Sequence, residues 1–165
     1  MHRLNTPDYA RKVIRPAIEE GAAKTGRRPS DVDLVANPFV VTGENDAELA
    51  ASRELIRRHI SFYAATRSYK AVMEFHGYSE IADRLIALST QEKWDDMPAL
   101  VSDEMLEGLA IVGRWEELPK KLAAKWGGLL TSVNPVFGPP CAHLQERQRA
   151  CFLRLASLMD DRKSM

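Results

Sequence analysis

Hydrophobic residues recur at the three- and four-residue spacing of amphipathic helices over most of the chain. The longest such pattern runs from Asn45 to Tyr63, and Asn45 with Glu48 three positions later has the spacing of a capping box. A first helix is predicted to begin at Thr6 and to be interrupted at Pro16, which cannot donate a hydrogen bond within a helix. Several short helices are predicted from residue 66 to residue 107. The pattern therefore predicts a helix-rich protein.

Two segments have the composition of short strands. Residues 32–41 are mostly apolar rather than alternating, which is typical of a strand covered on both faces in a parallel sheet, although Pro38 predicts an irregularity there. Residues 129–133 are the second strand candidate, and 109–112 form a short apolar run between the two. Strands that alternate with helices argue for an α/β fold built of parallel units. Two strands cannot form a stable parallel sheet by themselves, so the predicted sheet lacks partners.

The composition is that of a soluble protein with one domain over residues 1–165. Lys and Arg number 23, as do Asp and Glu, so the formal net charge is zero and neither nucleic acid nor an anionic membrane is an expected partner. The first residues lack the apolar stretch of a secretory signal, and no window approaches the ~20 apolar residues of a membrane span. We therefore expect a cytoplasmic protein with free thiols at Cys141 and Cys151, and the scattered histidines predict no metal site.

Three residues are candidates for binding a substrate. Arg67 and Tyr69 lie in a segment that joins two predicted helices, and loop residues carry binding more often than residues within elements. Asn134 follows a predicted strand end, where α/β proteins place their ligand sites.

Gly113 and Arg114 are candidates for binding an anionic part of a cofactor. They lead into a predicted helix whose first turn has free backbone N–H groups, and the glycine would permit close approach of a ligand. The alternative is a plain turn, since Glu116 and Glu117 already supply negative charge there.

An ordered set of segments resembles a known family. It comprises residues 6–21, 26–27, 40–43, 46–49, 60–64, 69–72 and 75–77, and then Ile111-Val112-Gly113 with the helix after it. Their order and spacing are similar to luciferase-like monooxygenases, and within these to the group that depends on a deazaflavin, coenzyme F-420. The likeness extends from Asn5 to Trp126, and none of its motifs is a catalytic signature, so no catalytic residue is assigned.

The resemblance implies a (β/α)₈ TIM barrel of which this chain looks like the C-terminal portion. Residues 32–41 would be the seventh strand, 129–133 the eighth, 68–107 a helical insertion between them, and 138–165 a C-terminal helix and tail. The first six strands have no counterpart, so the barrel would be incomplete. The implied activity is hydride transfer with a small organic substrate, with coenzyme F-420 or FMN as cofactor and no metal. Since most cofactor contacts in the family come from the missing strands, the isolated chain is expected to be inactive.

A different class of function also fits the residues. A non-catalytic helical module could use its exposed strand edges to self-associate as a homodimer or to pair with another chain. A truncated gene product without a stable role is a third reading. The sequence leaves the substrate, the choice between deazaflavin and FMN, and the oligomeric state open.

Overall fold

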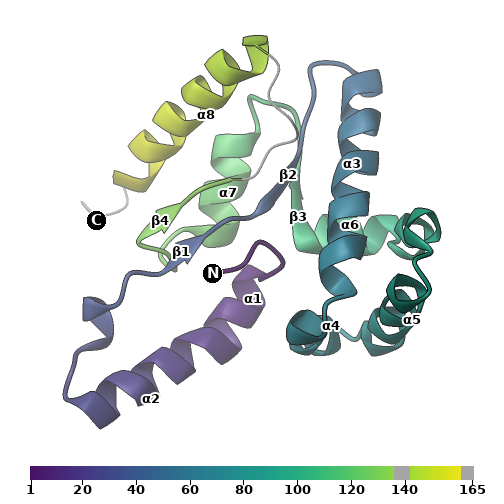
Figure 1. Ribbon diagram of the computed structural model, residues 1–165. Coiled ribbons are helices and arrows are strands. Elements are labelled where there is room, and N and C mark those ends of the chain that lie inside the picture. Colours follow the sequence, from purple (N-terminus) through teal and green to yellow (C-terminus); the bar gives the residue numbers. More distant parts are fainter. Residues whose placement is uncertain (136–141, 161–165) are drawn as a thin grey trace.

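The computed structural model describes residues 1–135 and 142–160 (Figure 1). Its α-helices are α1 (Pro7–Tyr9), α2 (Arg15–Thr25), α3 (Asp46–Ala64), α4 (Lys70–Phe75), α5 (Ser79–Thr90), α6 (Asp103–Leu109), α7 (Leu118–Trp126) and α8 (Ala142–Asp160). Short helical turns of other types are η1 (Ala10–Ile14), η2 (Pro29–Asp31), η3 (Arg67–Tyr69), η4 (Trp94–Asp96) and η5 (Pro98–Leu100). The strands are β1 (Val35–Ala36), β2 (Phe39–Val41), β3 (Ala110–Val112) and β4 (Ser132–Val133).

The strands pair in two parallel pairs at the centre of the molecule (Figure 1). Val35 lies opposite Ser132 in the pair of β1 with β4, and Val40 lies opposite Ile111 in the pair of β2 with β3. The prediction of parallel pairing is confirmed. The fold is a helix-rich α/β arrangement with few strands in the described residues.

The strand boundaries differ from those predicted. The segment 32–41 is divided into β1 and β2 at Asn37 and Pro38, because proline cannot donate a ladder hydrogen bond. The second predicted strand, 129–133, is reduced to β4, and Leu129 lies buried in a turn before it. The apolar run 109–112 supplies a strand that the two-strand prediction omitted, because β3 is stabilised by pairing with β2 across about 70 residues of sequence.

The helix boundaries follow local chemistry. Asn45 caps α3 by accepting a hydrogen bond from the Glu48 amide at 2.9 Å, and the Glu48 carboxylate accepts one from the Glu44 amide at 2.9 Å. Gly43 permits the tight turn from β2 into α3, since a Cβ there would lie 2.5 Å from the Leu49 nitrogen. Pro16 is accommodated directly after the π-helical segment η1, which breaks the regular α-helical ladder at the predicted interruption.

The two faces of the β2–β3 pair are covered by different helices. Phe39, Val41 and Ala110 belong to a buried cluster with residues of α3, α5 and α6. Val40 and Ile111 belong to a second buried cluster with residues of α7 and α8. The pair is thus the middle layer between α3 and α7, and α8 lies along α7 (Figure 1). This layering leaves the outer edge of β3 between two helices.

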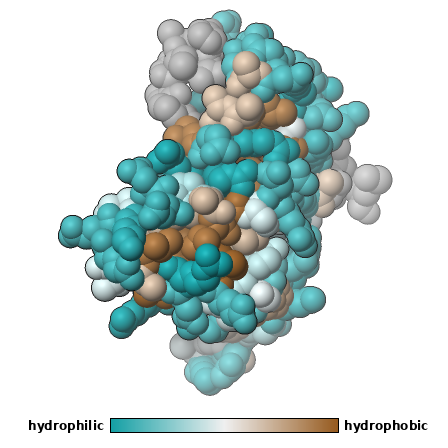
Figure 2. All heavy atoms as spheres, turned by 90° about the vertical axis from the view of Figure 1, so that its right-hand side faces the viewer, coloured by the Kyte–Doolittle hydropathy of each residue, from teal (hydrophilic) through white to brown (hydrophobic). Residues whose placement is uncertain are grey.

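The segments outside the sheet are largely helical. Residues 68–107 contain α4, α5, η4, η5 and most of α6, as predicted for short helices, while their description as an insertion stays a prediction. Hydrophilic residues cover most of the face that carries α5, with hydrophobic residues gathered near its centre (Figure 2). Within the predicted C-terminal helix and tail, 138–141 and 161–165 lie outside the described residues, as does Cys141. Burial raises the pKa of the Cys151 thiol to about 11, above its ordinary value.

Candidate functional site

A groove of about 650 Å³ runs along the outer edge of β3, between α3 and α7. Leu49 and Arg53 of α3 form one wall, Lys121 and Lys125 of α7 form the other, and Val112 lies between them. The volume falls within the roughly 300–1,000 Å³ of ligand pockets, and an apolar lining with a few convergent polar groups is typical of such sites. The groove is therefore the candidate ligand site in the part of the chain that the structure describes.

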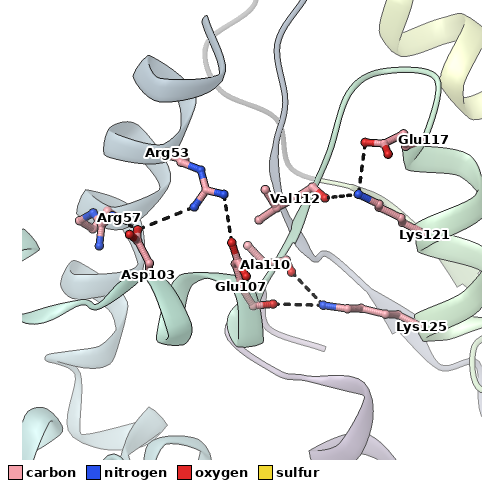
Figure 3. Close-up of polar contacts among 9 residues, drawn as sticks. All are labelled: Arg53, Arg57, Asp103, Glu107, Ala110, Val112, Glu117, Lys121 and Lys125. Carbon is pink, nitrogen blue, oxygen red and sulfur yellow. Dashed lines mark hydrogen bonds and ion pairs between the residues drawn. The ribbon is translucent and has the colours of Figure 1, made fainter. Parts of the chain in front are cut away.

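Lys121 and Lys125 of α7 bind backbone carbonyl groups at the floor of the groove (Figure 3). Lys121 Nζ donates to the Val112 carbonyl at 3.0 Å and lies 3.2 Å from the Glu117 carboxylate. Lys125 Nζ donates to the carbonyls of Glu107 and Ala110, both at 3.2 Å. Burial of its ammonium lowers the pKa of Lys125, and the charge of Glu107 opposes that shift.

The opposite wall carries an arginine–carboxylate network. Arg53 lies 3.0 Å from Glu107 and 3.7 Å from Asp103, and Arg57 lies 2.7 Å from the same Asp103 oxygen (Figure 3). The hydrogen bond from Arg57 holds the pKa of the Asp103 carboxyl below its usual value. The network joins α3 to α6 and fixes one wall of the groove.

The structure places Gly113 and Arg114 in the groove, but the anion position at that turn is filled. The Arg114 amide donates to the Glu117 carboxylate at 2.8 Å, and this bond and the Lys121 ammonium lower the pKa of Glu117. A Cβ on Gly113 would lie 2.8 Å from the same carboxylate and 2.9 Å from Lys121 Nζ. The Arg114 guanidinium pairs with Asp46. As folded, this turn does not fit a cofactor phosphate unless Glu117 is displaced.

The three predicted substrate residues lie elsewhere. Tyr69 stacks on the His2 ring at a centroid distance of 3.9 Å, and Arg67 is exposed on η3 beside it. Asn134 follows β4, where its backbone N–H donates to the Ala36 carbonyl at 2.8 Å. The structure brings Arg67 and Tyr69 together through η3, and none of the three lines the groove described above. Their assignment to a substrate stays a prediction.

His59 and His76 are partly buried. His76 Nε2 lies 2.8 Å from the hydroxyl of Thr6, and burial lowers the pKa of His76, with the charge of Asp8 opposing the shift. Burial likewise lowers the pKa of His59, whose Nδ1 is enclosed in the protein. Among the described residues, no group of His, Cys, Asp or Glu side chains could hold a metal ion. No described helix has the length and apolarity needed to cross a membrane.

The family model for luciferase-like monooxygenases matches residues 1–131, a stretch that includes β1 to β3 and the whole groove. The chain belongs to the luciferase-like monooxygenase family. The uncharacterized proteins Mb1395 of Mycobacterium bovis and Rv1360 of Mycobacterium tuberculosis are each 35% identical over 136 residues, which is 82% of this chain and 40% of the relative. The luciferase-like chain thus spans 40% of the length of these curated relatives.

Sequence analysis of this luciferase-like chain missed the lysines of the groove. Lys121 and Lys125 are spaced by four residues, and that spacing places both on one face of α7. Their acceptors come from residues 107–112, which only the fold brings near. The four-residue spacing of the two lysines was the signal available in the sequence. Without the position of β3, that spacing indicates no more than a solvent-exposed helix face.

Proposed function

We propose that the chain forms part of an oxidoreductase in which hydride passes between a flavin or a deazaflavin and a small organic substrate. The observation that carries this proposal is the family match over residues 1–131. The bound cofactor would supply the hydride chemistry, and the protein would position it and the substrate. The family match does not favour the alternative, a non-catalytic interaction module.

We further propose that these 165 residues do not catalyse hydride transfer by themselves. Glu117 fills the one cofactor position that sequence analysis assigned, at Gly113 and Arg114. In addition, relatives of the family carry sequence for which this chain has no counterpart, since the match covers 40% of their length. Arg67, Tyr69 and Asn134 remain the proposed substrate residues, and a cytoplasmic location remains the expectation.

Fluorescence titration of the purified chain with FMN, and separately with coenzyme F-420, tests the proposal. We expect no saturation below about 0.1 mM of either cofactor, because a partial site forms few of the contacts that micromolar affinity requires. Saturable one-to-one binding near 1 µM would contradict the claim that the chain is incomplete as a redox site. In that event, Arg114→Ala measured against Arg84→Ala, an exposed arginine on α5, would show whether the predicted turn binds the cofactor.

A further inference from the structure

Among residues 1–135 and 142–160, which the structure describes, β3 pairs with β2 on one edge and with no strand on the other. The Gly113 amide donates to the Val41 carbonyl at 3.1 Å, so the backbone groups of Ile111 and Gly113 point toward β2. Successive residues of a strand point their backbone groups to opposite edges. Ala110 and Val112 therefore direct their carbonyls away from β2 and into the groove. An edge of this kind offers acceptors to any further strand.

Those two carbonyls are bound by Lys121 and Lys125 of α7. Lys121 Nζ donates a hydrogen bond to the Val112 carbonyl at 3.0 Å, and Lys125 Nζ donates one to the Ala110 carbonyl at 3.2 Å (Figure 3). The lysine spacing of four residues on a helix covers roughly 6 Å, which is close to the two-residue advance of a strand. The match in spacing lets one helix face serve alternate carbonyls of one strand.

The position of α7 is itself fixed by burial. Leu118, Leu122 and Trp126 on its inner face are 0%, 1% and 3% exposed, so the lysines on the neighbouring face are held over β3. Lys121 is held further by Glu117, 3.2 Å away. A strand that added to β3 would have to displace two charged hydrogen bonds, and it would leave the ammonium groups in a less polar setting.

We propose that Lys121 and Lys125 close the open edge of β3 against a strand from a second copy of this chain. The same edge of a second copy is the complementary partner present in any solution of the protein, because it carries the same alternation of donors and acceptors. Two such edges related by a two-fold axis would pair antiparallel, residue 110 of each copy facing residue 112 of the other. The lysines thus keep a strand edge of the protein from self-association, independently of the proposed redox function.

Sedimentation of the double variant Lys121→Met with Lys125→Met tests this proposal. Methionine keeps the apolar stem and removes the ammonium donor. The matched control is Lys120→Met with Lys93→Met, which removes the same charge from two exposed lysines, one of them adjacent on α7. We expect the weight-average mass of the double variant to rise with concentration toward twice that of the wild type, while the control keeps the wild-type mass. Equal masses for the double variant and the control would overturn the proposal.

Hydrogen exchange identifies the surface that associates. In the double variant, the Val112 amide should exchange more slowly as concentration rises, because the second copy would accept its hydrogen bond. Association without slower exchange at Val112 would also overturn the proposal, since the contact would then lie elsewhere. If the double variant fails the circular dichroism test of folding, the single variants Lys121→Met and Lys125→Met are compared with Lys120→Met by the same two measurements.

Discussion

Replacing Thr6 by alanine should lower the unfolding free energy more than replacing an exposed threonine by alanine. Thr6 is 4% exposed, and its hydroxyl accepts a hydrogen bond from the Tyr9 amide at 3.2 Å as the cap of the first helix. The same hydroxyl lies 2.8 Å from Nε2 of His76, the residue that directly follows α4. One side chain thus joins the N-terminal helix to the helical segment 68–107.

The magnitude follows from the two bonds that are lost. Removal of a threonine cap costs about 1 kcal/mol. Leaving the partly buried His76 nitrogen without its partner adds roughly 1–2 kcal/mol, at the lower end for a group that water can partly reach. The sum is about 2–3 kcal/mol, which for a chain of this length lowers the melting temperature by roughly 4–12 °C.

Urea unfolding followed by circular dichroism at pH 7.5 measures this loss. Thr66→Ala is the matched control, because Thr66 is exposed and its side chain makes no cap bond at η3; its change should stay within about 0.5 kcal/mol. Thr6→Ser should recover most of the loss, since the hydroxyl is retained. Equal unfolding free energies for Thr6→Ala and Thr66→Ala would refute the reasoning.

Three further predictions follow from burial. Burial lowers the pKa of His59 and His76 in the folded state below the ordinary histidine value of 6.5. The stability that depends on these neutral imidazoles is therefore fully present above pH 6.5 and is lost as pH falls below it. A higher unfolding free energy at pH 5.5 than at pH 7.5 would contradict this prediction. Leu122→Ala should cost about 2–4 kcal/mol in urea unfolding, against little change for Lys120→Ala on the exposed side of α7. Cys151, with its pKa raised to about 11, should react with a thiol reagent at pH 8 only after denaturant is added; rapid reaction of that thiol in the native protein, located by peptide mapping, would show that it is accessible.

The elements that the sequence predicted well are those decided by neighbouring residues. The capping pair Asn45 and Glu48 marked the start of α3, and Pro38 marked the break between β1 and β2, because both effects act within a few positions of the chain. The run 109–112 was recognised in sequence only as short, apolar and strand-like and was not counted among the strands, since three apolar residues become a strand only through pairing with β2.

The candidate site shows the same division. Gly113 and Arg114 were found in sequence as a turn before a helix, and the structure places both in the groove. That Glu117 fills this turn depends on a side-chain conformation, although the charge of Glu117 had already suggested the plain-turn alternative. The role of Lys121 at the β3 edge required the tertiary position of α7, which no local pattern contains.

Calorimetric titration with coenzyme F-420 and with FMN, carried out on this luciferase-like chain and on the longer Rv1360 protein of Mycobacterium tuberculosis, tests whether the chain supplies only part of a redox site. We predict saturable binding of one of the two cofactors by the longer protein and none by the 165-residue chain at the same concentrations. Binding of equal affinity by both proteins would contradict the claim of an incomplete site, and no binding by either would contradict the proposed flavin or deazaflavin chemistry.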